Sequence, residues 1–592
     1  MRSSKLLILT LLAGCLGAFA CADSFNEGAF SPNQEDPELG KSLFEPARET
    51  DGKEDALRGR KGLKTSVDRS ATAVWEVKNL WTDIDTPAAR EAGVAWEANS
   101  GLTWDEKYAS WVDSMKKVDA HSSGATFQLT TPFGKVLPAP SIECAETSLF
   151  LRAAFASWYQ LPFFVEAKDA QGQRLYLGHF GFRTASGKYA NSANFRTAYK
   201  DYSDIAQTWR DQGWPQDQKL RGRRLGGSQD DMQPALFEGA HAGAYFDEIF
   251  LNKRTGYFMI YLLSYFGSVN LADPSNTFNL KPEATRAGDT LLQRWQRRGI
   301  GHTLVVKKVS APQEGFFEVE LVSGSMPRRQ PKWESASSSK YSLTAQKSGG
   351  PEMSNDDVPF AKLGGGIKRW RVATPIEDRW TNIVPPQDQG VFIRSTDFQA
   401  IGARIETYEN LIVELPPEQK REAILERIIA ARDHLSRYPA SCAARLRREE
   451  AFVDLYTLER EVFFTDAQEV DATYRRLEDY VFSALSYEES KTCCWNKSTA
   501  AMYEIIMDYA EREVASAGDA CVAPSVFKAS QGGYELWANH AMSLGRDHEW
   551  APWSEDEFCP QRDVRDDVIN VDFKVTDYCS LTPEVEADGE VE

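Results

Sequence analysis

The sequence predicts an α+β domain followed by a mostly helical domain that is stapled by disulfide bonds. Two observations support this prediction. Between residues 144 and 322, apolar helical segments alternate with short β-branched runs, which is typical of helices packed on a sheet. From about residue 400, the chain instead carries amphipathic helical segments and a group of cysteines. We place the two domains at residues 73–398 and 399–592.

The N-terminus has the pattern of an export signal. Residues 1–5 are basic, and residues 6–19 form an apolar run that is too short for a stable membrane span. Ala18-Phe19-Ala20 permits cleavage before Cys21, whereas Leu12-Ala13-Gly14-Cys15 resembles a bacterial lipoprotein box, in which the cysteine is lipidated. We therefore predict a signal peptide over residues 1–21. The protein is expected in the bacterial cell envelope, lipid-anchored or periplasmic, or as a secreted protein.

The segment after the signal is polar and charged. Residues 22–72 carry few large apolar side chains after Phe44, which predicts a disordered linker. No later apolar run is long enough to span a membrane, so membrane contact is expected only through an N-terminal lipid anchor. An acidic tail begins at Glu584.

Charge and motifs exclude several functions. The net charge is −19, from 68 basic and 87 acidic residues, and nucleic-acid binding needs a basic surface, so nucleic acid is not an expected partner. The chain has no phosphate-binding glycine loop, no nucleophile elbow and no zinc-binding His-Glu-x-x-His helix, so we expect no cofactor and no metal. His540 and His548, beside Asp547, are a weak metal candidate, because disulfide bonds explain the nearby cysteines better.

Export permits disulfide bonds. The last third of the chain holds an even set of cysteines, compatible with three bridges whose pairing the sequence does not reveal: Cys442, Cys493, Cys494, Cys521, Cys559 and Cys579. Cys144 is then left over as a working thiol, unless Cys21 survives cleavage without a lipid and pairs with it.

Cys144 is the strongest candidate for chemistry. It follows a loop rich in proline and glycine (residues 132–140) and precedes an apolar helical run (Ser148–Phe155). A thiol at a helix N-terminus meets unpaired backbone N–H groups and the positive end of the helix dipole, and both favour the nucleophilic thiolate. The alternative is a small buried apolar residue, which is common for cysteine.

Periodicity predicts the other elements of the two domains. Trp104–Val118 is expected to be a packing helix, residues 236–267 mixed helix, and residues 330–358 a long loop. Strands are predicted at Phe163–Ala167, Arg174–Phe182, Gly301–Val309, Gly315–Val322 and Leu363–Val372, and C-terminal helices at Pro417–Leu435, Ala443–Leu458, Ala467–Leu485 and Ser498–Val514.

A nucleophilic cysteine needs a base, and His302 has the most suggestive setting. It follows Gly301 at the start of a β-branched run, and Gly288-Asp289 forms a turn before the preceding strand. His179, at the end of a strand-like stretch, is a second candidate base. The remaining candidates, His121, His241 and His434, lack a strong local context.

The order of these motifs resembles the papain-like cysteine hydrolases of the NlpC and CHAP type. The shared features are a cysteine at a helix start, a Gly-Asp turn before one strand and Gly-His opening the next, over roughly residues 130–330. The resemblance implies that these two strands are neighbours in a small antiparallel sheet packed on the cysteine helix. It implies that Cys144 is the nucleophile, His302 the general base and Glu320 the residue that orients the imidazole, with Glu318 and Ser323 as substitutes.

The gap between Cys144 and His302 is longer than in compact members of that family. Residues of about 184–280 are therefore expected to form an insertion, of a kind that commonly lines or covers a groove. The resemblance implies an exported thiol hydrolase that cleaves amide or peptide bonds, with peptides of the cell-wall peptidoglycan as a substrate. The alternatives are a non-catalytic envelope lipoprotein that binds peptide or glycan, and an assembly scaffold whose functional part is the helical domain.

Overall fold

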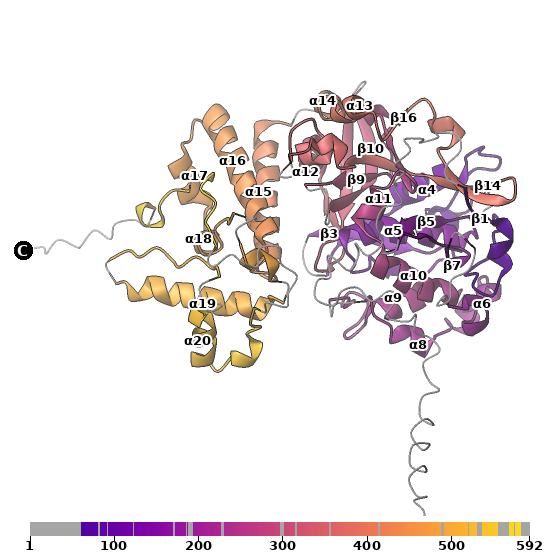
Figure 1. Cartoon of the computed structure of the whole chain (residues 1–592), viewed down its shortest axis with the longest axis horizontal. Coiled ribbons are helices and arrows are strands. Elements are labelled where there is room, and N and C mark those ends of the chain that lie inside the picture. Colours follow the sequence, from indigo (N-terminus) through magenta and orange to yellow (C-terminus); the bar gives the residue numbers. More distant parts are fainter. Residues whose placement is uncertain are drawn as a thin grey trace, which may run out of the picture. The chain divides into compact units, whose positions relative to one another are not determined.

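The computed structural model of the protein describes two compact units (Figure 1). Each unit is made of two segments of the chain. The first unit comprises the chain up to Trp333 and residues Ser342–Leu411, and the second comprises Glu334–Tyr341 and the chain from Ile412. The predicted signal peptide, Cys559 and the acidic tail lie outside the described residues. The described residues are 61–581, except for 81–82, 84, 92, 122–123, 170–171, 185, 187–192, 227–229, 296–300, 314–315, 355–356, 413–414, 487–489, 496, 519, 530–534, 554–566 and 574.

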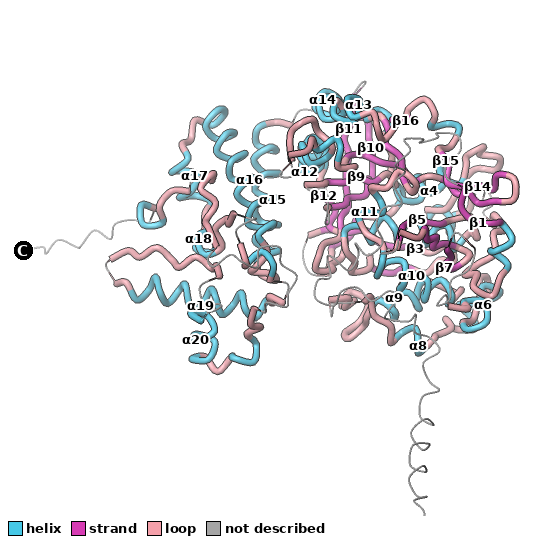
Figure 2. Tube along the Cα trace, in the orientation of Figure 1, coloured by secondary structure: helices cyan, strands magenta, loops and turns pink. Residues whose placement is uncertain are grey.

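A seven-stranded sheet forms the centre of the first unit (magenta in Figure 2). Its central neighbours β11, β10, β9, β13 and β8 pair antiparallel, so the α+β class is confirmed, in a sheet larger than predicted. In spatial order the strands are β12 (Lys332–Glu334), β11 (Phe316–Ser323), β10 (His302–Gln313), β9 (Thr290–Gln293), β13 (Gly366–Trp370), β8 (Thr277–Leu280) and β16 (Phe392–Ile393).

Helix α5 (Cys144–Trp158) packs on this sheet and is buried along its whole length. The Ser148 hydroxyl lies 2.8 Å from the Thr290 hydroxyl of β9 and accepts a hydrogen bond from the Trp370 indole of β13. The predicted arrangement is present here: the strand after Gly288-Asp289 and the strand that His302 opens are antiparallel neighbours beneath the cysteine helix.

Further helices surround α5 and build a core rich in aromatic side chains. Helix α4 (Trp104–Ser114) begins at a capping box formed by Thr103 and Glu106, and its Trp111 ring lies 5.4 Å from the ring of Phe155 in α5. Helices α9 (Ala242–Ile249) and α10 (Lys253–Tyr265) lie beside α5, as Figure 1 shows.

Two sequence predictions need correction in this unit, and a third in the segment that the chain divides between the two units. The expected insertion at 184–280 includes β8, which is an internal strand of the central sheet, and α10, which is core rather than a peripheral cover. The end of the predicted linker, residues 61–72, is ordered and buries Leu63. The expected loop at 330–358 contains β12 and α12 (Ala336–Thr344).

Three small sheets and several short helices complete the first unit. The sheets are β1 (Lys61–Lys64), β15 (Arg379–Ile383) and β14 (Val372–Ile376); β2 (Lys117–Asp119), β3 (Ala125–Thr130) and β4 (Val136–Pro138); and β5 (Phe164–Lys168), β6 (Arg174–Gly178) and β7 (Gly181–Thr184). The helices are α3 (Pro87–Glu91), α6 (Phe195–Ala198), α7 (Trp209–Gln212), α8 (Gln218–Arg221), α11 (Ser268–Leu271), α13 (Phe398–Gly402) and α14 (Arg404–Leu411).

The second unit is helical, as predicted, but its main segment starts at Ile412 because α13 and α14 belong to the first unit. The predicted helix 467–485 is two helices that break at Arg475, whose backbone is extended and whose guanidinium binds Glu449. The helices are α15 (Pro417–Leu435), α16 (Cys442–Leu458), α17 (Ala467–Tyr474), α18 (Leu477–Val481), α19 (Ala500–Ser516) and α20 (Glu535–Ser543).

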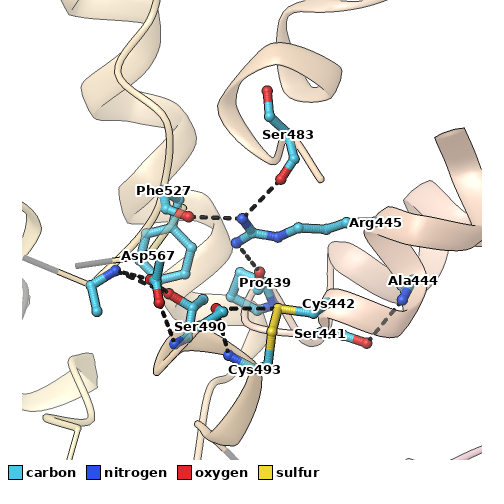
Figure 3. The surroundings of a disulfide bond; sticks show 12 residues. Pro439, Ser441, Cys442, Ala444, Arg445, Ser483, Ser490, Cys493, Phe527 and Asp567 are labelled. Atoms are coloured by element: carbon cyan, nitrogen blue, oxygen red, sulfur yellow. Dashed lines mark hydrogen bonds between the residues drawn. A yellow bond between two sulfur atoms is a disulfide. The ribbon is translucent and has the colours of Figure 1, made fainter. Parts of the chain in front are cut away.

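Two disulfide bonds staple the second unit, Cys442–Cys493 and Cys521–Cys579. Figure 3 shows the first, which fixes the start of α16 beside buried Arg445; that guanidinium donates to the carbonyls of Ser483, Phe527 and Pro439. Two of the three predicted bridges are thus present. None of the helices in the described part of the chain has the length and apolar character needed to cross a membrane.

Candidate functional site

Cys144 is the first residue of α5 and stands where the helix meets the end of the central sheet. Its side chain is a thiol rather than half of a disulfide, as the cysteine count predicts, and the residue is 8% exposed. The Sγ atom lies 3.9 Å from the carbonyl oxygen of Gly301, the residue before β10. The helix start and the strand start are therefore in contact.

Gly301 is required by the close approach of its neighbours. A Cβ atom there would lie 2.3 Å from the carbonyl oxygen of Gln293, on the adjacent strand. The Gly301 N–H also donates to the Ser268 hydroxyl at 2.9 Å. Glycine at this position thus lets the strand start lie against both β9 and Cys144.

The register of β10 decides where His302 lies. His302 is opposite Gln293, and Thr303 is opposite Leu292, which packs in the core beneath α5. Opposite residues of an antiparallel pair share a face, so strand alternation puts half-buried His302 on the Gln293 face, away from the face that α5 covers. The structure brings Cys144 to the strand start.

The structure does not place Glu320 beside His302, which corrects the prediction that Glu320 orients the imidazole. Glu320 lies opposite Lys308, about 20 Å further along β10, and its carboxylate accepts a hydrogen bond from the Trp333 indole. Glu318 is further away still, opposite Ser310. Of the three candidates only Ser323, the buried last residue of β11, lies toward the His302 end of this hairpin.

The Gly288-Asp289 turn has a structural role. Gly288 has a φ of 85°, and a Cβ atom there would lie 2.7 Å from the Tyr108 ring. The buried Asp289 carboxylate binds the Arg369 guanidinium through two hydrogen bonds of 2.7 and 2.8 Å. This bidentate ion pair fixes the start of β9 against β13.

A buried ion cluster surrounds the residues on either side of Cys144. The Arg328 guanidinium contacts Glu143, Glu146 and Asp230, at 2.9, 2.8 and 2.5 Å. Burial opposes the charge of Arg328, but the three carboxylates outweigh it and hold its pKa well above the ordinary value.

All three carboxylates of this cluster meet the Arg328 guanidinium. Negative charge beside Cys144 opposes the thiolate, whereas the N-terminus of α5 favours it.

A second histidine, His241, lies in a hydrogen-bonded pair that sequence reasoning missed. The ring nitrogen Nδ1 of His241 lies 2.9 Å from Oδ1 of Asp231, a fully buried carboxylate. The other oxygen of Asp231 accepts the backbone N–H of Leu225 at 2.9 Å. The available signal was the position of His241 directly before the apolar segment that forms α9.

The His241 segment is tied to the segment that leads into Cys144. The Gln233 side chain accepts from the Ser141 N–H at 2.7 Å and donates to the Ser141 carbonyl at 2.8 Å. Asp230 binds Arg328, which binds both glutamates beside Cys144. These contacts hold the two segments against each other.

The other candidate histidines have structural settings. His179 is fully buried; burial lowers its pKa to about 3, against a hydrogen bond to Phe163, so its ring stays uncharged in the core near neutral pH. His540 is bonded to Asp508 at 2.6 Å. In the described ranges, no group of three or more histidine, cysteine or acidic residues is arranged to hold a metal ion.

Comparison with protein-family models, with curated proteins and with solved structures found no match to this chain.

Proposed function

We propose that the protein is an exported thiol hydrolase of papain-like type that cleaves amide or peptide bonds, with cell-wall peptides as its substrate class. The observation that carries the proposal is the contact of the Cys144 thiol with Gly301, the residue before His302, at the end of the β9–β10 pair. It supports the proposal because the cysteine helix and the two strands follow the order and pairing that the resemblance implies.

In the proposed reaction, His302 accepts the proton of the Cys144 thiol. The Sγ electron pair attacks the amide carbon, the C–N bond breaks, and the imidazolium gives its proton to the leaving amine. Backbone N–H groups in the first turn of α5 have no acceptor within the helix and are suited to bind the oxyanion. Water then hydrolyses the thioester, which releases a carboxylic acid and restores the thiol.

A binding function without catalysis is the second candidate. It is favoured by the carboxylates of Glu143 and Glu146 on either side of Cys144, and by the position of Glu320, which lies opposite Lys308 rather than beside His302. Such an envelope protein would keep the fold to bind peptide or glycan. The two functions differ in whether the thiol reacts.

The direct test is incubation of the mature protein with purified peptidoglycan, followed by quantification of new amino groups. The wild type should release amines, and Cys144→Ala should release none, while both bind the sacculi. His302→Gln should lose most of the activity, because general acid–base groups contribute about 100-fold or more. Equal release by wild type and Cys144→Ala, or no release by either, would contradict the proposal.

A further inference from the structure

We propose that Arg294 is a positioning residue of the Cys144 site, whose buried guanidinium supports the thiolate from behind Gly301. This inference rests on the proposed function, because it concerns the thiol that acts in it. It adds a residue that the resemblance does not assign, directly after strand β9. The arginine acts on the thiol through space and is held in place by Gly301 and Ser268.

Arg294 packs directly against the residue that contacts the thiol. A Cβ atom on Gly301 would lie 2.7 Å from Cδ of Arg294, and the Gly301 carbonyl oxygen lies 3.9 Å from Sγ of Cys144. Nη1 of Arg294 donates to the Ser268 hydroxyl at 3.4 Å, and the same hydroxyl accepts the Gly301 N–H at 2.9 Å. The arginine, the serine and the thiol therefore all meet at Gly301.

The guanidinium lies in a buried setting. Arg294 is 1% exposed and Ser268 is 3% exposed, and the backbone N–H of Arg294 donates to the Lys347 carbonyl at 2.8 Å. Combined with standard covalent dimensions, the contacts at Gly301 place the guanidinium at most about 13 Å from Sγ of Cys144. Solvent and salt screen a buried charge much less than a surface charge, so the guanidinium acts on the thiol over this distance.

A cation at this place matters because other groups oppose the thiolate. The Gly301 carbonyl oxygen faces Sγ, and a hydrogen-bond acceptor there favours the protonated thiol. The N-terminus of α5 favours the thiolate, and a positive charge behind Gly301 adds to that effect. Helix α11 carries no charged residue. Charged and titratable groups around this end of α5 include, besides Arg294, Glu143, Glu146, Asp230, Arg328, His302 and Lys347.

The test is the pH dependence of iodoacetamide labelling of Cys144, followed at its peptide by mass spectrometry, in two variants that differ in charge. Arg294→Met removes the charge and keeps a long side chain, whereas Arg294→Lys keeps the charge and loses the planar fork of donors. A unit charge at that distance, at an effective dielectric constant of about 20, shifts the midpoint by about one pH unit. Arg294→Met should therefore raise the midpoint by that amount, and Arg294→Lys should stay close to the wild type.

The matched control is Arg254→Met, which removes a charge at the other end of α5, where the Thr255 hydroxyl lies 2.6 Å from the Ser157 hydroxyl. It should keep the wild-type midpoint. Arg294→Gln is a second neutral variant if Arg294→Met loses its thermal unfolding transition.

An unchanged midpoint in a folded neutral variant would overturn the inference. A midpoint raised by about one pH unit in Arg294→Lys would overturn it as well, whether or not the neutral variants fold, because packing rather than charge would then be responsible. Failure of the wild type to release amines from peptidoglycan would overturn the proposed function instead, and the labelling midpoints would still decide the role of Arg294.

Discussion

The Cys144 Sγ atom lies 3.9 Å from the carbonyl oxygen of Gly301, so the first turn of α5 is in contact with the residue that precedes His302 and strand β10. A residue at a helix start and a residue at a strand start, far apart in the sequence, are brought together by the packing of α5 on β9 and β10. The chemistry proposed for Cys144 depends on this contact.

Replacing Gly301 with alanine should disturb the contact directly. The new Cβ atom would lie 2.3 Å from the Gln293 carbonyl oxygen, a backbone atom that cannot move without shifting β9. We expect a loss of unfolding free energy of about 1–3 kcal/mol and a changed rate of Cys144 alkylation. Urea denaturation and iodoacetamide labelling would measure both. The matched control is Gly390→Ala, at a glycine with open space around its Cβ position and no left-handed backbone conformation.

Removing the charge of Asp289 should destabilise the first unit strongly. Asp289→Asn leaves the buried Arg369 guanidinium without its bidentate partner, and breaking a buried ion pair costs about 3–5 kcal/mol. Arg512→Ala removes an exposed ion pair with Asp508 and should cost less than about 1 kcal/mol. Equal unfolding midpoints for the two variants would contradict the structural role of the Gly288-Asp289 turn.

His179 should make the stability of the protein fall at acid pH. Its folded pKa, about 3, is below its ordinary value near 6.5, so its contribution is complete above pH 6.5 and is lost as the pH falls and the unfolded chain takes up a proton. Between pH 6.5 and 5, the wild type should lose about 2 kcal/mol more than His179→Asn. Urea denaturation at several pH values measures this difference, and parallel curves would contradict it.

The two disulfide bonds should stabilise the second unit selectively. Each closes a long loop, with sequence separations of 51 and 58, and the chain-entropy model assigns about 4 kcal/mol to such a loop. Paired replacement of Cys442 and Cys493 by serine should lower the unfolding temperature of that unit. Hydrogen exchange should rise within residues 412–581 and stay unchanged around Cys144; protection lost equally in both units would contradict this assignment.

Local patterns in the sequence were enough to predict many elements. Helix α15 begins and ends where its amphipathic period predicts, and the pairing of β9 with β10 follows from the turn and glycine signals that bound each strand. The thiol state of Cys144 followed from the even number of cysteines downstream. These features depend on residues close in sequence, or on simple counts.

Features that depend on distant residues could not be predicted. The face on which His302 lies is set by its register with Gln293, and a shift of one residue would reverse it. The Arg328 cluster joins two glutamates at the start of α5 to an aspartate from a second segment, through an arginine from a third. The His241–Asp231 pair depends on a loop whose polar residues give no periodic signal. Such pairings are set by packing of the whole unit.

The most direct test of the account is the pH dependence of the reaction of Cys144 with iodoacetamide, followed by intact-mass spectrometry. An activated nucleophile should reach half of its maximal rate below about pH 7, since the α5 N-terminus and the proposed pairing with His302 favour the thiolate, and His302→Gln should move that midpoint upward. A wild-type midpoint at or above about pH 8.5, unchanged in His302→Gln, is the behaviour of an ordinary thiol and would contradict the proposal that Cys144 is the nucleophile.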